Sequence, residues 1–279
     1  LHSCLAANRI EEVIGILNGT TNFILTKMFR EGMSFESALA LAQRLGYAER
    51  DPAADVEGHD ACRKICILAS LAFGEHVYPH DVSAEGITKI TSEDVAYAAS
   101  CGCVIKLIGA ARRGEGGKRM TAYVAPAFIN RETQLGTIDD VFNGILVRGD
   151  ATGDVVFYGK GAGKLPTASA VVSDMIACAK ADGSSASMSW KPSQGGNVAP
   201  QGDHVTAMYL RCRAFETNAL EEAVKIFGKV KALSRPDKPT NEAAFITPAL
   251  TEREIDDVCG KLAAAGIDIL GKIRVLADQ

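Results

Sequence analysis

Acidic side chains gather in one short stretch of this 279-residue chain, and a lysine follows them. Within twelve residues the stretch contains five carboxylates: Glu49, Asp51, Asp55, Glu57 and Asp60. Carboxylates can hold a cationic amino group, whereas a lysine ammonium can stabilise negative charge on oxygen and deliver a proton. Lys64 follows Asp60 by four residues, the spacing that places two side chains on one face of a helix. The stretch therefore predicts either a site for an amino-bearing substrate or an ordinary ion pair worth roughly 0.2–0.5 kcal/mol.

A helix is expected to carry the second half of this stretch. An Asp-Pro pair at residues 51 and 52 favours extended backbone, so the helix begins later, with Asp55 or a neighbour as its N-cap. Its apolar residues recur with helical spacing until Gly74 ends it. Asp60 and Lys64 lie on the same face of this helix as its apolar residues. If both charges lie away from water, this position favours a substrate site over an ordinary solvent-exposed ion pair.

A strand and two helices are predicted ahead of the acidic stretch. Residues 11–17 are apolar and rich in Ile and Val, as in a strand. An Asn-Gly-Thr-Thr turn follows and caps a helix over residues 22–30, and a serine caps a second helix over residues 35–45. Gly19 and Thr20 thus lie where a strand ends and a helix begins, where amide and hydroxyl groups suit a carboxylate or another anion. A plain Ser/Thr cap is the alternative on local evidence.

Two segments of the chain resemble signatures of the homoserine dehydrogenase family. The family's substrate-site pattern, L-G-Y-x-E-x-D-P-x-x-D-v-x-G-x-D-x-x-x-K, is matched at Leu45, Gly46, Tyr47, Glu49, Asp51, Pro52, Asp55, Gly58, Asp60 and Lys64. The other hallmark, Gly-Ile-Leu-Asn-Gly-Thr-Thr-Asn-Phe-Ile, spans residues 15–24. The resemblance covers residues 1–182 and continues more loosely to the end. It implies hydride transfer between NADP(H) or NAD(H) and the aldehyde carbon of L-aspartate 4-semialdehyde, which gives L-homoserine.

The resemblance also implies a role for each of these residues. Lys64 would stabilise the charge that grows on the carbonyl oxygen and supply the proton, with Asp60 as its orienting partner. Glu49 and Asp55 would hold the substrate ammonium. Three further residues would line the substrate or nicotinamide side of the site: Tyr47, which forms a wall, Thr20 and Gly19.

A glycine-rich tract follows a predicted strand pair and precedes a helix that starts near residue 166. Residues 143–148 and 154–158 are expected to pair, and Gly-Lys-Gly-Ala-Gly occupies residues 159–163. The spacing does not match the dinucleotide fingerprint, and a tight turn is the alternative on local evidence. The resemblance implies that this tract closes over the cofactor, with Gly163 near the nicotinamide and Gly161 in the same site.

The order of predicted elements indicates an α+β chain with two domains. Residues 82–158 contain several adjacent strands with few helices between them, so we expect a mixed or antiparallel sheet covered by helices. The first of these strands is expected over residues 82–87, and a Gly-rich hairpin turn at residues 114–117. This sheet belongs to a substrate-binding, catalytic and dimerisation domain over residues 1–182. Residues 183–203 are rich in Ser, Gly, Pro and Gln and predict a linker. Residues 204–279 follow the strand-helix-strand-strand-helix-strand order of a small ferredoxin-like domain.

The C-terminal segment resembles the ACT domain, the amino-acid-sensing module of many homoserine dehydrogenases, which implies threonine as an effector. The Asp-x-x-Gly turn usual after the first strand of ACT domains is absent, because Phe-Glu-Thr-Asn stands at residues 215–218. We expect Asn218 to adopt the left-handed backbone angles of the missing glycine.

Composition argues against several classes of protein. A formal net charge of −4 and a pI of about 5.8 provide no basic field for nucleic acid. No apolar run suits a membrane span, and the first residues lack the order of a signal peptide. Eight irregularly spaced cysteines are typical of reduced thiols in a cytoplasmic protein. His59, Cys62 and Cys66 lack a fourth ligand for zinc, so no metal site is predicted.

A strand-GxGxxG-helix motif does not occur in the sequence. Because homoserine dehydrogenases carry a Rossmann domain ahead of the matched region, we interpret the chain as a fragment without its main cofactor site, inactive alone. The choice between NAD and NADP stays open, and the family implies a homodimer or tetramer. The alternative function is a non-catalytic module for amino-acid binding and regulation or for dimerisation.

Overall fold

The structure, a computed structural model, describes residues 4–114, 116, 119–181 and 190–276. The described strands form one continuous sheet in the order β6-β5-β1-β3-β4-β11-β7-β9-β8, with short β2 beside β4 and β10 beside β7. The strands are β1 (Ile10–Ile16), β2 (Ser83–Ala84), β3 (Cys103–Arg112), β4 (Thr121–Asn130), β5 (Phe142–Gly149), β6 (Gly153–Lys160), β7 (Val205–Ala214), β8 (Lys231–Leu233), β9 (Glu242–Ile246), β10 (Leu250–Thr251) and β11 (Ile267–Val275). The β2–β4 and β11–β4 pairs are parallel and the other described pairs are antiparallel. The sheet is therefore mixed, within the predicted α+β class.

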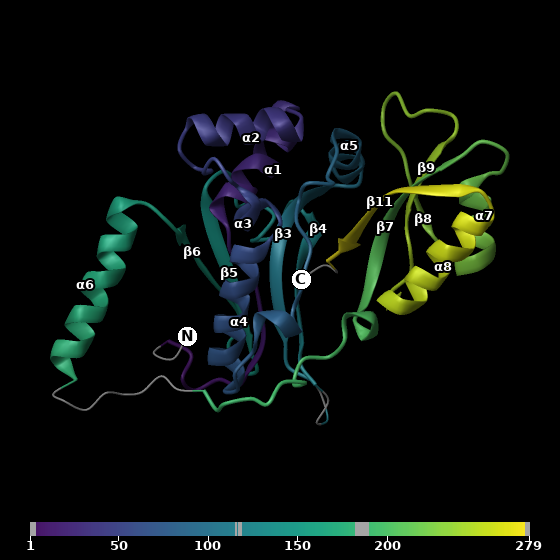
Figure 1. Cartoon of the computed structure of the whole chain (residues 1–279). Helices are drawn as coiled ribbons and strands as arrows, with labels where there is room; N and C mark the ends of the chain where they lie inside the picture. Colours follow the sequence, from purple (N-terminus) through teal and green to yellow (C-terminus); the bar gives the residue numbers. More distant parts are fainter. Residues whose placement is uncertain (1–3, 115, 117–118, 182–189, 277–279) are drawn as a thin grey trace.

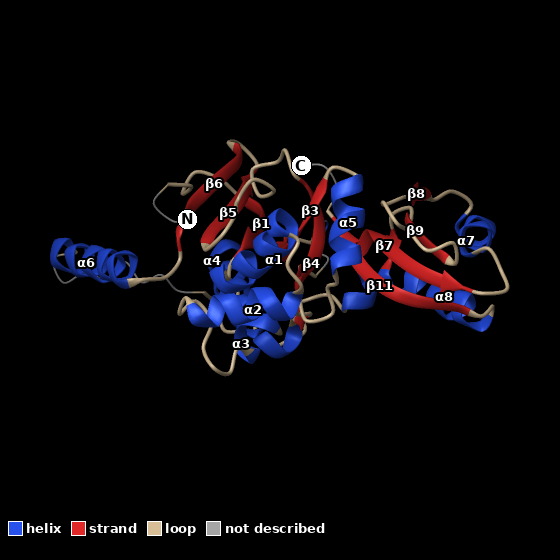
Figure 2. Cartoon of the chain, turned by 90° about the horizontal axis from the view of Figure 1, so that it is seen from above, coloured by secondary structure: helices blue, strands red, loops and turns tan. Residues whose placement is uncertain are grey.

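Helices of the first half lie against one face of this sheet, as Figures 1 and 2 show. They are α1 (Gly19–Glu31), α2 (Phe35–Arg44), α3 (Ala53–Val56), α4 (His59–Phe73) and α5 (Ser92–Ser100). Strand side chains alternate between the two faces of the sheet. In β3, Ile105 and Leu107 pack into the core beneath the helices, whereas Val104 and Ile108 belong to a second apolar cluster. Both faces of the central strands are therefore buried, which explains their nearly continuous apolar sequence.

Helix α1 begins at Gly19, earlier than the predicted residue 22. Asn18 is its N-cap, and the Asn18 side chain accepts a hydrogen bond from the amide of Thr21. Gly32 ends the helix in the left-handed conformation, as expected. The Asn-Gly-Thr-Thr segment thus forms the first turn of α1, so Gly19 and Thr20 lie at the helix N-terminus.

The prediction that α4 begins near Asp55 is wrong. Gly58 is the residue before this helix and has a φ of 80°, a left-handed conformation that interrupts the helical path. Asp55 instead belongs to the four-residue helix α3, and its carboxylate accepts a hydrogen bond from the side chain of Asn18. The end of α4 at Gly74, with a φ of 78°, agrees with the prediction.

Two other segments differ from the predictions. A strand was expected over residues 82–87, but only the two residues of β2 pair with β4. Asn218 has a φ of −90° and is the N-cap of the following helix, so the expected left-handed conformation is wrong. The predicted hairpin turn at residues 114–117 lies partly outside the described residues.

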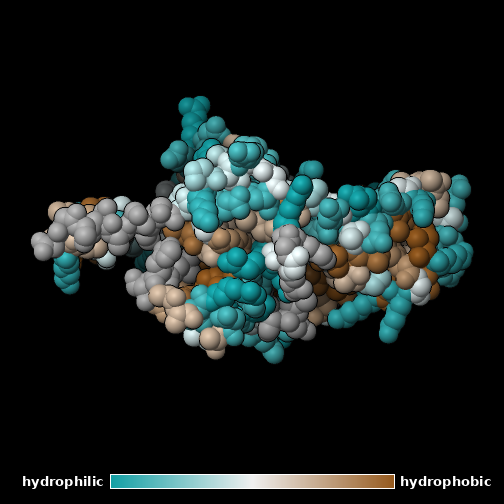
Figure 3. Space-filling model, turned by 90° about the horizontal axis from the view of Figure 1, so that it is seen from below, coloured by the Kyte–Doolittle hydropathy of each residue, from teal (hydrophilic) through white to brown (hydrophobic). Residues whose placement is uncertain are grey.

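The C-terminal elements follow the predicted strand-helix-strand-strand-helix-strand order, with β10 as an additional short strand. The two helices are α7 (Ala219–Phe227) and α8 (Glu252–Ala264), which pack on the β7–β9–β11 part of the sheet. Apolar side chains reach the surface of this region (Figure 3). Strand β11 lies between β4 and β7 and joins this region to the first half.

Two buried ionic clusters also join the halves. In the first, Arg211 of β7 contacts Asp94 of α5 at 2.9 Å, and Glu242 accepts a hydrogen bond from Tyr97 of α5 at 2.9 Å. In the second, Arg274 of β11 lies between two carboxylates, those of Glu252 and Glu85. Buried charges require such partners, so both clusters fix the relative position of the two halves.

Residues 190–200, in the predicted linker, run along the first half. The amide of Lys191 donates to the carbonyl of Gly74, and the indole of Trp190 contacts His76 at 2.6 Å. Farther on, the amide of Met120 donates to the carbonyl of Asn197. The described part of this segment is thus held by backbone hydrogen bonds.

Helix α6 (Lys164–Lys180) extends away from the sheet, as Figures 1 and 2 show. None of its residues is buried. Its apolar side chains are therefore exposed, among them Leu165, Val171, Val172, Met175 and Ile176. Among the described residues, no helix combines the length and the apolar character that a membrane span requires.

Candidate active site

Asn18 connects the two predicted acidic residues that approach the start of α1. Its side-chain NH₂ donates to Asp55 at 2.7 Å and to Asp60 at 2.9 Å. Its carbonyl oxygen accepts from Thr21 at the same time, so the whole amide is used. Asn18 is buried, which fixes both carboxylates relative to α1. The sequence interpretation missed this role, because an asparagine before a helix is also what an ordinary N-cap requires.

Lys64 completes this cluster from α4. Its ammonium donates to Asp60 Oδ2 at 2.8 Å and to the backbone oxygen of Leu17, at the end of β1, at 3.0 Å. Asp60 Oδ2 therefore accepts from both Lys64 and Asn18. The Lys64 side chain is 46% exposed and the Asp60 side chain 31%, so the two charges do not lie away from water as the site interpretation required. The ammonium is nevertheless held in place by its two acceptors. A held but accessible ammonium suits contact with a ligand oxygen.

Thr20 and Tyr47 form a second contact at the N-terminus of α1. The Thr20 hydroxyl donates to the backbone oxygen of Tyr47 at 2.7 Å. The Tyr47 ring packs edge-on against Phe23 of α1, with 5.0 Å between ring centroids. The loop after α2 is thereby tied to the same helix end as Asn18, and the exposed Tyr47 ring can form a wall there.

The carboxylate of Glu49 is placed differently from those of Asp55 and Asp60. Glu49 is exposed, and its carboxylate makes no hydrogen bond or ion pair with a described residue. The backbone oxygen of Glu49 accepts from Gln43 at 3.1 Å, which ties its loop to α2. The structure thus joins Asp55, Asp60 and Lys64 through direct contacts but leaves the Glu49 side chain in solvent.

Gly161 and Gly19, from the two glycine-bearing segments, both lie beside Asn143 of β5. A Cβ atom added to Gly161 would lie 2.6 Å from Asn143 Nδ2, and one added to Gly19 would lie 3.4 Å from Asn143 Oδ1. Gly163 has a φ of 114°, which strains any other residue. The glycine-rich turn before α6 and the start of α1 are therefore neighbours, although they are far apart in the sequence.

A Cβ atom at Gly19 would also lie 2.8 Å from the backbone oxygen of Val141, so packing against neighbouring protein atoms excludes a side chain at Gly19 and at Gly161. The contact of this turn with a nicotinamide stays a prediction. Among the described residues, no group of three or more His, Cys, Asp or Glu side chains is arranged to hold a metal ion.

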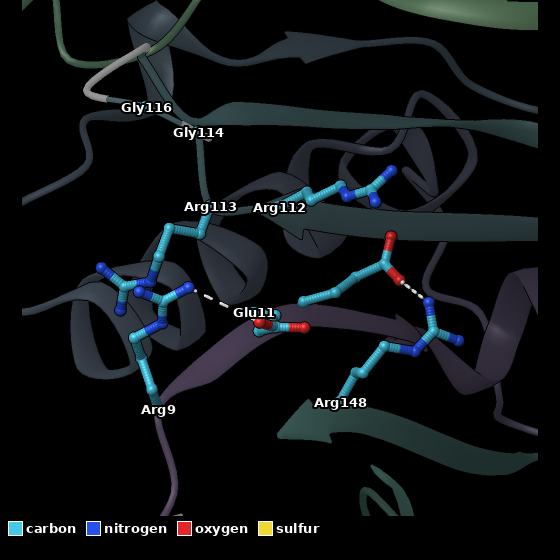
Figure 4. Close-up of a pocket in the computed structure, with 8 residues that line it drawn as sticks. Arg9, Glu11, Arg112, Arg113, Gly114, Gly116 and Arg148 are labelled. Carbon is cyan, nitrogen blue, oxygen red and sulfur yellow. Dashed lines mark hydrogen bonds and ion pairs between the residues drawn. The ribbon is translucent and has the colours of Figure 1, made fainter. Parts of the chain in front are cut away.

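Two cavities lie elsewhere in the molecule. One, of about 380 Å³, lies at the opposite end of β1 from Asn18, and Figure 4 shows its arginines. Arg148 in this cavity is paired with Glu12 at 2.7 Å. The other cavity, of about 590 Å³, lies between the β7–α7 loop and the loop before β9. Neither cavity is lined by the acidic cluster or by Lys64.

The model of the homoserine dehydrogenase family matches residues 1–176. A homoserine dehydrogenase from Synechocystis sp. is 51% identical over 178 residues, which cover 63% of this chain and 41% of that protein. The crystal structure of a homoserine dehydrogenase from Thiobacillus denitrificans superposes with a TM-score of 0.88 at 35% identity, covering 99% of this chain and 66% of that one.

A hyperthermophilic archaeal homoserine dehydrogenase mutant in complex with NADPH superposes with a TM-score of 0.53 at 28% identity. The match covers 63% of this chain and 50% of that one. The present chain thus spans about two fifths of the length of its curated Synechocystis relative. The family model, the sequence relative and both structures agree, and the chain belongs to the homoserine dehydrogenase family.

Proposed function

We propose that this chain forms the substrate-binding and catalytic part of an enzyme that interconverts L-homoserine and L-aspartate 4-semialdehyde with NAD(P). The observation that supports this proposal most is the convergence of Asp55, Asp60 and Lys64 on Asn18. The test is oxidation of NADPH by the complete enzyme on addition of L-aspartate 4-semialdehyde. An enzyme that binds both compounds without oxidising NADPH would overturn the proposal.

Lys64 is proposed to act on the carbonyl oxygen of the substrate. The nicotinamide cofactor, when bound, supplies the hydride for reduction of the aldehyde or accepts it in the reverse direction. Negative charge grows on the carbonyl oxygen during reduction, and the ammonium of Lys64 stabilises that charge and donates the proton. Asp60 and the backbone oxygen of Leu17 hold two of the ammonium hydrogens, which leaves the third for the substrate.

Carboxylates are proposed to hold the cationic amino group of the substrate. Asp55 uses one carboxylate oxygen for Asn18, and its other oxygen makes no hydrogen bond to a described residue. Glu49 is exposed and unpaired in the described chain, so it is free to turn toward an ammonium. Tyr47, Thr20 and Gly19 are proposed to line the same ligand.

The dinucleotide is proposed to bind mainly to a domain outside this chain, with Gly161 and Gly163 against the nicotinamide. The exposed apolar residues of α6 support this proposal, because such a helix needs a packing partner. We expect this polypeptide alone neither to bind NADPH or NADH nor to oxidise them. Titration followed by cofactor fluorescence measures this, and tight binding to the polypeptide alone would contradict the expectation.

A second candidate function, amino-acid sensing, is proposed for residues 204–279 as an ACT-like domain, joined by residues 183–203 to the catalytic domain of residues 1–182. The 590 Å³ cavity favours it, because it adjoins the N-terminus of α7, where Asn218 caps the helix. Lys238 and Thr240 also line this cavity. Threonine is the proposed ligand, and a rise in melting temperature with threonine, but not with alanine, would support it.

We further propose that the enzyme is a cytoplasmic homodimer or tetramer that assembles through the sheet of the catalytic domain. Sedimentation of the complete enzyme would test the assembly, and a monomer at micromolar concentration would contradict it. The proposed compartment rests on the eight irregularly spaced cysteines of the sequence, since reduced thiols are usual in the cytoplasm.

A further inference from the structure

Asn143 lies between two segments that the proposed function assigns to ligands. It is the second residue of β5 and pairs in register with Gly159 of β6. The glycine-rich turn begins directly after this pair, and its Gly161 adjoins the Asn143 amide nitrogen. On the other side, Gly19 adjoins the Asn143 amide oxygen. A side chain at either glycine would collide with its surroundings, so Asn143 fills the space between both backbones.

The amide group of Asn143 has unused hydrogen-bonding capacity. Its Oδ1 is buried and has no hydrogen-bond partner, one of three such side-chain atoms among the described residues. Its Nδ2 also donates to no described residue and is not among those buried atoms, so it is not completely buried. Buried amides without partners are rare in native proteins, and a missing ligand is one of their recognised causes. The NH₂ group of Asn143 thus has two hydrogens without an acceptor in the described chain.

Asn22 fixes the chain that leads to Asn143. Its side-chain NH₂ contacts three backbone oxygens, those of Ile138 at 3.1 Å, Asp140 at 2.9 Å and Phe142 at 3.2 Å. Lys106 of β3 supports Asn22, because its ammonium donates to Asn22 Oδ1 at 3.1 Å. Lys106 is 2% exposed, and its burial lowers the pKa of its ammonium. A buried lysine and a fully used asparagine thus set the position of the residue immediately before Asn143.

The start of α1 adds donors on the same side. The first amides of a helix have no acceptor within the helix. In α1 the Thr21 amide is satisfied by Asn18, whereas Gly19 and Thr20 occupy the first two helical positions. Their amides and the Asn143 NH₂ group therefore offer several donors, close to the helix start where Asn18 binds the carboxylates of Asp55 and Asp60. Such a set favours a ligand oxygen that carries full or partial negative charge.

We propose that Asn143 is a further ligand-binding residue, whose side-chain NH₂ donates to a planar oxygen of a ligand bound beside Gly19 and Gly161. This inference rests on the proposed function, which supplies two sources of such an oxygen. One source is the carboxylate of the amino-acid substrate, and the other is the carboxamide of the nicotinamide. Each is an sp² oxygen, and a binding experiment with separate ligands distinguishes them.

The experiment measures dissociation constants for the complete enzyme by calorimetry, first for NADPH alone and then for L-homoserine in the presence of NADP⁺. Asn143→Asp keeps the shape of the side chain and replaces the donor by an anionic acceptor. Asn197→Asp is the matched control, because Asn197 also has a buried Oδ1 without a partner but lies beside His76, at the other end of α4. Melting temperatures of both variants report folding.

Asn143→Asp is expected to weaken one of the two ligands by about tenfold or more, because one hydrogen bond is lost and a like charge is introduced. Weaker homoserine binding identifies the substrate carboxylate, and weaker NADPH binding identifies the carboxamide. Asn197→Asp should leave both constants within about twofold of the parent enzyme. Asn143→Ala is the second variant in case Asn143→Asp does not fold, and it should weaken the binding of the same ligand.

Unchanged constants in folded Asn143→Asp and Asn143→Ala, with both ligands bound by the parent enzyme, would overturn this inference alone. A parent enzyme that binds neither ligand would overturn the proposed function as well. Equal weakening by Asn143→Asp and Asn197→Asp would show a general effect on folding and would also reject a specific contact.

Discussion

At the scale of single residues, the acidic site depends on an amide. Two neighbouring carboxylates would be unfavourable without a donor between them, and Asn18 supplies that donor to both Asp55 and Asp60. The sequence predicted the two carboxylates and Lys64 from their spacing and family pattern. It could not predict Asn18 as their link, because that contact depends on how the end of β1 meets the start of α4. The opposite holds for Glu49, which matches the family pattern although its carboxylate does not contact Asp55, Asp60 or Lys64.

Replacement of Lys64 by alanine should lower the turnover of the complete enzyme by about 100-fold or more, because the reaction loses its proton donor. The dissociation constant of the cofactor should stay unchanged. Lys27→Ala is the control, because Lys27 forms an ion pair of the same spacing with Glu31 on α1, at 2.7 Å. Steady-state kinetics and a cofactor titration measure both effects. Normal turnover in Lys64→Ala would remove Lys64 from the mechanism.

Asn18→Ala should raise the KM for homoserine and lower turnover, because Asp55 and Asp60 lose their shared donor. It should also cost about 1 kcal/mol of stability through the lost N-cap of α1. Ser34→Ala removes a comparable cap from α2, where the Ser34 hydroxyl accepts from the amide of Ser37. Equal kinetic defects in the two variants would argue that the cap alone matters. Denaturant unfolding and steady-state kinetics provide the two readouts.

At the scale of elements, local patterns predicted the helices and long strands well, and the boundaries at the site poorly. Alternating and continuous apolar residues were enough to predict the strands β3, β4, β5 and β6, because the spacing of apolar residues along a strand reflects which of its faces are buried. The start of α4 was missed, because a glycine inside an acidic stretch gives no sign of its backbone angle. Gly58 adopts φ 80° and leaves no room for a side chain, since a Cβ there would lie 3.2 Å from Glu85 O.

Gly58 and Gly74, which lie immediately before and after α4, allow the effect of space around a left-handed glycine to be tested. Both are left-handed, but a Cβ at Gly74 would meet no atom within 4 Å. Gly74→Ala should cost about 1 kcal/mol for its backbone angle alone. Gly58→Ala should cost more, roughly 2–4 kcal/mol, and lower turnover, because displacement of the helix start moves Asp60 and Lys64. Thermal unfolding and activity assays test this, and equal losses in the two variants would contradict it.

At the scale of the whole molecule, the sequence indicated two units but not how they join. The C-terminal element order was predicted from the strand and helix pattern. The parallel pairing of β11 with β4 was not, because it involves residues that are more than a hundred positions apart. One partner of each buried arginine is similarly distant, Asp94 for Arg211 and Glu85 for Arg274. Long-range pairs of this kind depend on the tertiary arrangement and have no local signal.

Acid should weaken the joint between the halves through Glu252. Burial raises the pKa of Glu252, but hydrogen bonds from His204 and Arg274 outweigh burial and lower it to about 2. Since the pKa falls on folding from an ordinary value of 4.5, the carboxylate stabilises the fold above pH 4.5 and loses that effect as the pH falls toward 2. The contribution is about 3 kcal/mol.

Glu252→Gln should therefore lose less stability between pH 5 and pH 2 than the parent chain. Denaturant unfolding at several pH values measures the two slopes. Parallel pH dependence in the parent and the variant would exclude Glu252 as a source of acid sensitivity. Glu216→Gln is the control, because Glu216 is exposed in the loop before α7 and makes no hydrogen bond or ion pair with a described residue.

The position of β11 also affects the order in which the protein can form. Ribosomes make β4 long before β11, yet β11 is the strand that covers the open side of β4 and separates it from β7. Until β11 leaves the exit tunnel, the nascent chain exposes the part of the β4 edge that β2 does not pair, and another molecule can pair with it there. A premature stop before residue 267 would therefore produce a chain prone to aggregation, even though every residue of the acidic cluster had already been made.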